Sequence, residues 1–255
     1  MKKNTIPLWR RAAAAAVATL ALLVAGCASL PADQPRDARD PWEGYNRAMY
    51  KFNDTVDRAV LKPAATAYKS AIPQPVRRGV GNFFGNLSDA WSFVNHTLQG
   101  KPEGALTSFW RVLINTTIGL GGVLDPATEM HLERQREDFG QTLGVWGVKD
   151  GPYFVLPFLG PSTVRDTAAL PVDYYGNPLT YFKDLRLRNG LAVLRIVDTR
   201  ANARAATDVL EGAALDDYSF QRDAYLQKRR NDIYDGNPPS DGERYDLDTD
   251  NTPEP

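Results

Sequence analysis

The stretch EGYNRAMYKFNDTVDRAVLKP, residues 43–63, places apolar side chains at intervals of three and four residues. This spacing puts them on one side of an α-helix, which has 3.6 residues per turn. The members of this stripe are Tyr45, Met49, Phe52 and Val56. Pro63, which lacks a backbone N–H, ends the pattern. The stretch predicts an amphipathic helix whose apolar side packs against other elements.

Helical spacing continues through most of the remaining chain. Pro73 and Pro75 indicate a connector, and either Asn86 or Ser88 caps the helix that follows and ends near Gly100. Further helices are expected from Pro102 to the glycines at 119–122, and over residues 133–143, 187–210 and 216–234. Ser162 or Thr163 caps another helix that begins at Val164. Alternating strand patterns are scarce, so the fold class is predicted to be all-α.

The N-terminus reads as a secretory signal. Lys2, Lys3, Arg10 and Arg11 precede an apolar run of about 14 residues, which is too short for a bilayer span. The run ends in VAGC at Cys27, the only cysteine of the chain, and this stretch resembles a bacterial lipobox. Acyl chains on Cys27 would then anchor the protein. The alternative is an ordinary signal peptide that ends near a cysteine by chance.

Composition and charge divide the chain into four parts. We predict a lipoprotein signal peptide at 1–26, a lipidated linker at 27–41, a helical domain at 42–235 and a disordered acidic tail at 236–255. The stretch from Asp235 to the C-terminus holds seven acidic residues and one arginine, which leaves residues 27–234 close to neutral. Such a balance argues against nucleic acid as a partner. With one cysteine, no internal disulfide supports the fold.

Motifs for catalysis or metal binding are weak. Neither His96 nor His131 has a metal-ligating partner three or four residues away, so we predict no metal site. GVGNFFG, residues 79–85, lacks the third glycine of a dinucleotide-binding loop at the required position, and no GxSxG motif is present. We therefore expect no enzyme activity, and no cofactor besides the acyl chains on Cys27.

Several long segments together resemble the MlaA family, also called VacJ lipoproteins. They are DPWEGYNRAMYKFND, IPQPVRRGVGNFFGNL, FWRVLINTTIGLGGVLDPA, EDFGQTLGVWGVKDGPYFVLPFLGPSTVRD and RDAYLQKRRNDIYDG. The resemblance covers about residues 40–236. It implies a ring-like helical domain that sits in the periplasmic leaflet of the bacterial outer membrane, without spanning it, and encloses a central amphipathic channel.

The resemblance also implies a function and partners. Such proteins remove mislocalised phospholipids from the outer leaflet and so maintain the lipid asymmetry of the outer membrane. A trimeric porin holds the ring, and the lipid passes to a periplasmic MlaC-like carrier and then to an inner-membrane ABC transporter complex. Two rival hypotheses remain. The first is a lipid-anchored scaffold that stabilises porins without moving lipid, and the second is a periplasmic lipid hydrolase.

Candidate site residues follow from what a phospholipid needs along its path. Arg111 and Arg165 are candidate phosphate contacts, because a guanidinium pairs well with phosphate. A surface or helix-end ion pair is the simpler explanation of each arginine. The candidate lipid-facing residues are Asn82, Phe83, Phe84, Phe109 and Trp110, and core packing is the alternative for them. The candidate channel gate or hinge comprises Gly147, Gly151, Pro152 and Pro157, within a loop at 147–161 that would control access to the channel. The alternative is a rigid loop packed on the core.

Overall fold

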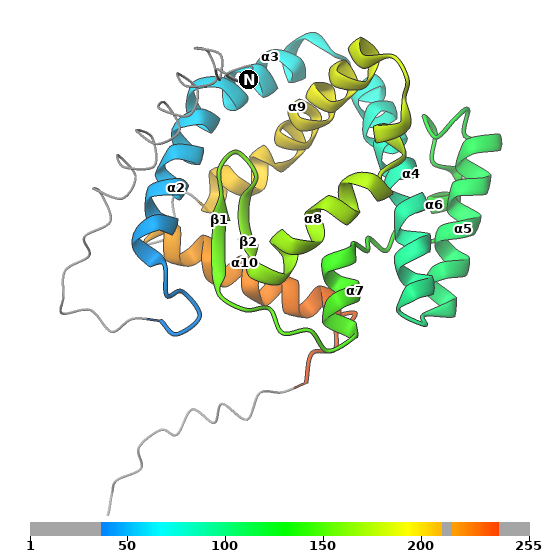
Figure 1. The fold of residues 1–255 in the computed structure, drawn as a ribbon. Helices are drawn as coiled ribbons and strands as arrows, with labels where there is room; N and C mark the ends of the chain where they lie inside the picture. Colours follow the sequence, from blue (N-terminus) through cyan, green and yellow to red (C-terminus); the bar gives the residue numbers. More distant parts are fainter. Residues whose placement is uncertain (1–36, 211–215, 240–255) are drawn as a thin grey trace, which may run out of the picture.

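A computed structural model describes residues 37–210 and 216–239 (Figure 1). Cys27, the signal segment, the first part of the linker and most of the acidic tail lie outside these residues. The first helical elements are α2 (Glu43–Val56), the π-helical turn η1 (Asp57–Leu61), α3 (Lys62–Ala71), α4 (Gln74–Leu98) and α5 (Pro102–Thr117). The remaining helical elements are α6 (Pro126–Glu129), α7 (Phe139–Val145), α8 (Val164–Gly176), the 3₁₀ turn η2 (Pro178–Tyr181), α9 (Leu185–Leu210) and α10 (Asp217–Ile233).

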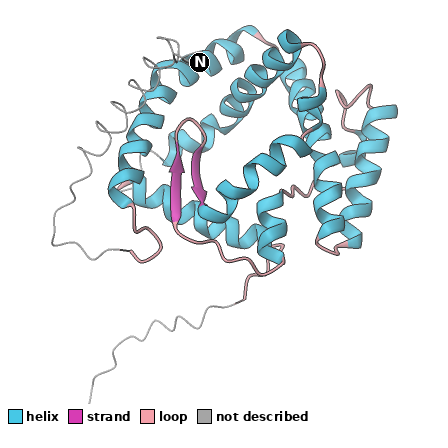
Figure 2. Ribbon diagram, in the orientation of Figure 1, coloured by secondary structure: helices cyan, strands magenta, loops and turns pink. Residues whose placement is uncertain are grey.

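The fold is mostly helical, with one small antiparallel hairpin. Strands β1 (Tyr153–Leu156) and β2 (Gly160–Thr163) pair in a single two-stranded sheet (Figure 2). The all-α prediction therefore holds for most of the domain and fails in this segment. Buried and partly exposed residues alternate over only the four residues of β1, with Tyr153 and Val155 buried. So short an alternation, flanked by Pro152 and Pro157, is difficult to recognise as a strand in the sequence. Within the described chain, no helix is both long and apolar enough to cross a bilayer.

Two asparagines of α2 hold the hairpin. The side chain of Asn46 donates to the Tyr153 carbonyl oxygen at 3.1 Å and accepts from the Val155 N–H at 2.9 Å. About two helical turns later, Asn53 binds the backbone of Leu156 and Phe158 in the same way, at 2.9 and 2.7 Å. The amide side chains thus satisfy an edge of β1 that has no neighbouring strand.

Helix α4 is continuous from Gln74, where the sequence suggested a connector followed by a cap at Asn86 or Ser88. The glycines inside α4 do not interrupt the helix, because side chains from other segments pack into the space that a Cβ would occupy. A Cβ at Gly79 would lie 2.9 Å from Val123, and one at Gly85 would lie 2.4 Å from the Arg134 guanidinium. The glycines therefore serve close packing, which compensates for their low helix propensity.

The long helices pack against one another and against the hairpin. Helices α4 and α5 pack along their length, α9 contacts both α3 and α4, and α10 contacts α7 and β2 (Figure 1). The apolar core at the hairpin contains Met49, Tyr153, Val155 and Tyr218. The stripe predicted for α2 is only partly inside: Met49 is buried, whereas Phe52 is exposed.

Two further helix boundaries follow local sequence signals, and a third does not. Thr163 caps α8 by accepting from the Asp166 N–H at 3.2 Å, and Pro102 opens α5, both as expected. The exception is the predicted helix at 133–143, since α7 begins only at Phe139. The side chain of Asp138 caps α7 there, accepting from the Gln141 N–H at 2.9 Å.

Candidate functional site

An apolar groove runs between α4 and α9. Its walls are Val80, Phe83 and Phe84 from α4, Leu191 and Leu194 from α9, and Val123 from the segment after α5. The groove has a volume of about 480 Å³, and its lining is almost entirely hydrocarbon and aromatic. Such a surface suits alkyl chains, because their burial removes apolar area from water.

The groove is built by a close approach of two segments. Gly79 leaves room for Val123, and the side chain of Asn82 donates to the Val123 carbonyl oxygen at 3.1 Å. Two predicted lipid-facing residues, Phe83 and Phe84, line the groove, whereas Asn82 ties its wall together. A contact with lipid stays a prediction for all three.

A smaller, basic pocket adjoins the groove and shares Phe84 with it. It has a volume of about 180 Å³, and its lining includes Gly81, Gly85 and Ser88 of α4, Arg195 and Asp198 of α9, and Arg136. Neither Arg136 nor Arg195 has an ion pair or hydrogen bond from its guanidinium to any side chain or backbone that the structure describes. Two arginines therefore face one pocket without a described counter-ion.

Electrostatics in this pocket reflect burial and like charge. Burial and the neighbouring Arg136 lower the pKa of Arg195 from its usual value. Asp198 also lines the pocket; its two oxygens accept from the Tyr68 hydroxyl at 3.0 Å and the Asn202 amide at 3.1 Å, and it forms no ion pair with either arginine in the described part of the chain. Burial raises the pKa of Asp198. Two guanidinium groups and one carboxylate leave the lining with a positive balance. The pocket is consequently suited to an anion.

Arg111, one of the predicted phosphate contacts, lies inside a protein ion-pair network. Only 1% of it is exposed, and its guanidinium binds Asp89 at 3.0 Å and both Asp125 oxygens at 3.1 Å. It also donates to Thr128 at 3.0 Å and to a backbone carbonyl. These contacts occupy the guanidinium and favour the structural alternative, so the phosphate role stays a prediction without geometric support.

Arg165 has a similar setting at the start of α8. It is buried, binds Asp166 at 2.9 Å, and forms a further ion pair with Asp150. Asp166 in turn accepts from Arg229 of α10 at 2.8 Å. Arg165 is therefore part of the packing of α8 against α10, and its predicted phosphate contact also lacks a free donor in the described structure.

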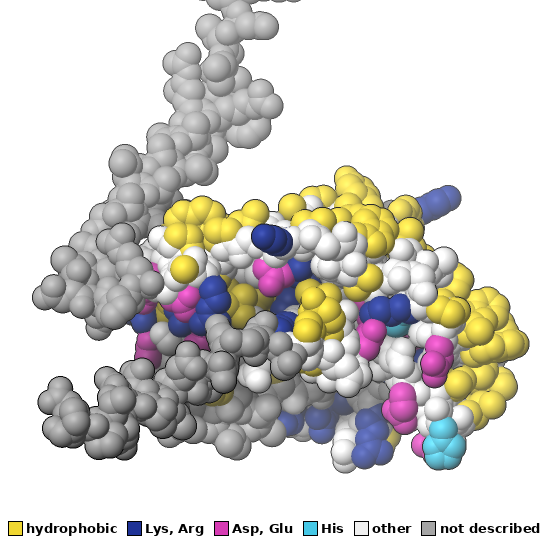
Figure 3. All heavy atoms as spheres, turned by 90° about the horizontal axis from the view of Figure 1, so that it is seen from below, with side chains coloured by type: hydrophobic (Ala, Val, Ile, Leu, Met, Phe, Trp, Pro, Cys, Tyr) yellow, Lys and Arg dark blue, Asp and Glu magenta, His cyan; other side chains and the backbone are white. Residues whose placement is uncertain are grey.

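Phe109 and Trp110, the other predicted lipid-facing residues, lie on a different surface from the groove. They are 43% and 48% exposed on the outer side of α5, with Leu106 and Leu113 beside them. The Phe109 ring lies 5.9 Å from that of Phe93 on α4 and 5.4 Å from that of Trp110. Hydrophobic side chains gather along this edge of the molecule (Figure 3). We define this α5 patch by Leu106, Phe109, Trp110 and Leu113.

The residues of the predicted gate flank and enter the hairpin. Gly147 follows the end of α7 with φ of 89°, and Gly151 has φ of 67°; both values lie in the left-handed region that favours glycine. The Gly147 N–H donates to the Gly144 carbonyl oxygen at 2.9 Å, so this glycine ends a helix. Pro152 precedes β1 and Pro157 follows it. The segment at 147–161 is thus largely a hairpin, and its motion stays a prediction.

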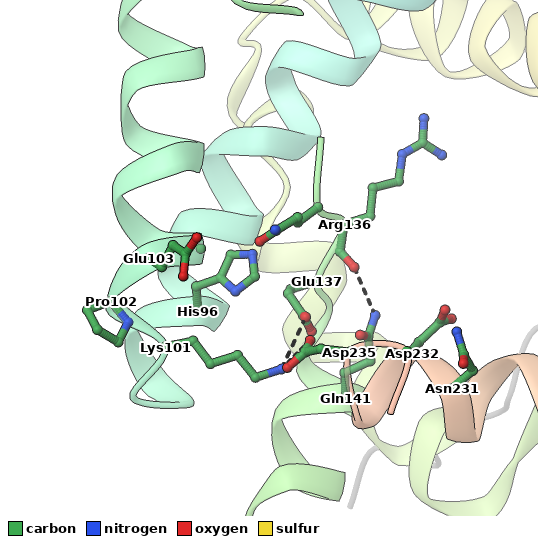
Figure 4. A pocket seen from close by; sticks show the side chains of 13 residues that line it. His96, Lys101, Pro102, Glu103, Arg136, Glu137, Gln141, Asn231, Asp232 and Asp235 are labelled. Atoms are coloured by element: carbon green, nitrogen blue, oxygen red, sulfur yellow. Dashed lines mark hydrogen bonds and ion pairs between the residues drawn. The ribbon is translucent and has the colours of Figure 1, made fainter. Parts of the chain in front are cut away.

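A third cavity, of about 590 Å³, lies where the end of α4 meets the end of α10. In Figure 4, Lys101 reaches Glu137 and Asp235, while the Arg136 side chain points away from His96 toward the open side. Burial and Lys101 lower the pKa of His96, and burial raises that of Glu137. Among the described residues, no group of three or more metal-ligating side chains occurs.

Sequence reasoning missed the basic pocket. Arg195 comes one position after Leu194 and four after Leu191, which are apolar residues of the helix predicted over residues 187–210. An arginine bordering an apolar stripe was the available signal. Arg136 gave none, because it lies in an extended segment that was predicted to be helical.

Comparisons with known proteins agree with the fold. The family model described as MlaA lipoprotein matches residues 38–232. The chain is 38% identical over 210 residues to the intermembrane phospholipid transport system lipoprotein MlaA of Escherichia coli, covering 81% of this chain and 82% of the relative. The Haemophilus influenzae protein of the same name is 34% identical, with coverages of 85% and 88%.

A solved structure supports the relationship in three dimensions. It is described as the structural basis for maintenance of bacterial outer membrane lipid asymmetry, and it superposes with a TM-score of 0.68 at 35% identity. The match covers 79% of this chain and all of that one. The chain belongs to the MlaA lipoprotein family.

Proposed function

We propose that this protein removes mislocalised phospholipids from the outer leaflet of the bacterial outer membrane and passes them toward the cell interior. Its relatives are named as lipoproteins of an intermembrane phospholipid transport system. The observation that carries the proposal is the apolar groove between α4 and α9 with a basic pocket that adjoins it at Phe84. A phospholipid combines the two chemistries that these neighbouring surfaces accommodate.

The finer arrangement is part of the same proposal. Acyl chains on Cys27 anchor the protein to the periplasmic face of the outer membrane, and the helices form a ring around an amphipathic channel. The exposed α5 patch supports contact with a membrane or with a trimeric porin, since apolar patches of this kind mark interaction surfaces. A periplasmic MlaC-like carrier accepts the lipid and delivers it to an inner-membrane ABC transporter complex. The protein itself acts without catalysis.

The test measures outer-leaflet phospholipid in cells that lack the protein. A membrane-impermeant amine reagent labels phosphatidylethanolamine exposed at the surface. We expect labelling to rise on deletion and to fall again with the wild-type gene. A Cys27→Ala variant should fail to rescue, because one strong anchor is lost.

Two other outcomes would replace the proposal. If deletion lowers porin abundance and leaves surface phospholipid unchanged, the protein is a scaffold. If the purified protein releases fatty acids from phospholipid, it is a hydrolase. Porin levels and free fatty acid are therefore measured in the same strains and preparations.

A further inference from the structure

Arg136 and Arg195 come from distant parts of the sequence and meet at one pocket. Arg195 lies on α9, beside the leucines that line the apolar groove, and Arg136 lies in the extended segment before α7. The two charges are close enough for Arg136 to disfavour the charged form of Arg195. Two like charges that share a pocket repel each other unless an anion lies between them.

The rest of the pocket leaves space for such an anion. Gly81, Gly85 and Ser88 form the α4 wall together with Phe84, and these three small residues help to leave a volume of about 180 Å³. Arg134, whose guanidinium approaches Gly85, is already paired with Asp89 at 3.0 Å. The other charged residue of the lining, Asp198, accepts from Tyr68 and Asn202, so Arg136 and Arg195 remain available among the described residues.

The neighbouring groove narrows the class of anion. Phe84 borders both cavities, so an anion held by the arginines would lie directly beside a hydrocarbon surface. A guanidinium matches the oxygens of a phosphate with two parallel hydrogen bonds. We propose that Arg136 and Arg195 bind the headgroup phosphate of a phospholipid whose acyl chains occupy the α4–α9 groove. This inference rests on the proposed function and deepens it, because it gives the transported lipid a defined binding position.

The assignment differs from the arginines that sequence alone suggested. Arg111 and Arg165 are buried and paired with aspartates, whereas Arg136 and Arg195 lack a described counter-ion and face a cavity. Because phosphate-binding groups must be accessible before the ligand arrives, the second pair fits the role better.

The experiment compares two ligands with matched acyl chains. Full-length wild-type protein is purified in a phosphate-free detergent and titrated with phosphatidylglycerol or with diacylglycerol, and native mass spectrometry counts the bound molecules. The variants are R136Q, R195Q, the double variant and R195K. R186Q is the matched control, since Arg186 is an exposed arginine on the same helix.

Each glutamine variant should weaken phosphatidylglycerol binding by about tenfold, the worth of one hydrogen bond to a charged group. Diacylglycerol binding should stay unchanged, and R195K should retain part of the phosphatidylglycerol affinity. R186Q should match the wild type. Thermal unfolding of each variant shows whether it is folded.

Inorganic phosphate separates a lipid headgroup from a free anion. A lipid site predicts that L194D abolishes phosphatidylglycerol binding, and that inorganic phosphate binds far more weakly than the lipid. Inorganic phosphate binding with the affinity of the lipid, unaffected by L194D, would overturn the proposal in favour of a free-anion site.

Two failures are distinguishable. If the wild type binds phosphatidylglycerol but the double variant keeps the same preference over diacylglycerol, the arginine assignment is wrong and the proposed function stands. If the wild type binds neither lipid and its deletion leaves surface phospholipid unchanged, the proposed function and this inference both fail.

Discussion

Asn46 of α2 acts as a strand neighbour for Val155 of β1: its side-chain oxygen accepts from the Val155 N–H at 2.9 Å. Its amide nitrogen donates to Asp40 at 2.8 Å and to the Tyr153 carbonyl oxygen at 3.1 Å. Asn46 and Val155 are both fully buried. Water therefore does not replace these hydrogen bonds when the side chain is removed.

Asn46→Ala should lower the free energy of unfolding by about 3 kcal/mol, because it leaves buried backbone groups unpaired. Asn53→Ala, at the more accessible turn, should cost about 1 kcal/mol. Chemical denaturation followed by far-UV circular dichroism measures both. Equal losses for the two variants would contradict the difference in burial on which the prediction rests.

Arg111 tests whether a buried arginine is structural. Arg111→Met should destabilise the fold by about 3 kcal/mol, since Asp89 and Asp125 would lose one of their two guanidinium partners while still largely buried, and only Arg134 would remain beside them. Combining it with Asp89→Asn should recover part of the loss. If Arg111→Met leaves the unfolding midpoint unchanged and abolishes lipid binding, the phosphate role predicted from sequence is correct.

His96 should make stability depend on pH. Burial and Lys101 lower its pKa, so the folded protein keeps the ring neutral while the unfolded chain binds a proton near pH 6.5. The unfolded state then binds more protons below that pH, and stability contributed by the neutral ring is lost as pH falls from about 7.5 to 5.5.

The comparison with a His96→Phe variant isolates this effect. Its unfolding midpoint should fall less over the same pH range than that of the wild type. The variant also removes two buried ring nitrogens that have no hydrogen-bond partner among the described residues. Glu137, whose raised pKa gives the opposite slope, is present in both proteins and cancels. Parallel pH profiles for the two would show that His96 does not titrate on unfolding.

Local patterns in the sequence predicted much of the fold, and contacts between distant segments account for what they missed. The apolar stripe of α2, the helical spacing of α9, the first-turn proline Pro102 and the cap at Thr163 all depend on residues close together in the sequence. The continuity of α4 depends on Val123 and Arg134, which fill the space left by its glycines. The hairpin depends on Asn46 and Asn53, more than 100 residues away.

The candidate site was likewise predictable only in part: its local aromatic pair could be found in the sequence, whereas its pair of arginines could not. Phe83 and Phe84 stand out in sequence because glycines flank two adjacent aromatic rings, and both line the groove. The meeting of Arg136 with Arg195 arises only when α9 packs on α4. A lone arginine has no signal that distinguishes an ion pair from a ligand contact.

The α5 patch should contribute to membrane association independently of lipidation. In a Cys27→Ala background, the double change Phe109→Ser and Trp110→Ser should reduce flotation with liposomes several-fold, because two exposed aromatic rings are lost. Phe220→Ser, which removes an exposed ring from the charged helix α10, is the matched control. Equal flotation of the patch variant and its control would remove the α5 patch from the membrane contact.

The predicted gate can be tested with an engineered disulfide. The Asn53 side-chain oxygen accepts from the Phe158 N–H at 2.7 Å, so cysteines at these two positions would link the hairpin turn to α2. Cys27 is the only native cysteine and carries the acyl chains in the proposed mature protein. If the hairpin moves during transport, the oxidised N53C/F158C protein should allow surface phospholipid to accumulate, and a reductant should reverse this. The two single-cysteine variants control for the loss of the Asn53 hydrogen bonds. Equal transport by the oxidised and reduced forms would show that the hairpin is a rigid part of the wall and that Gly147 and Gly151 serve its geometry alone.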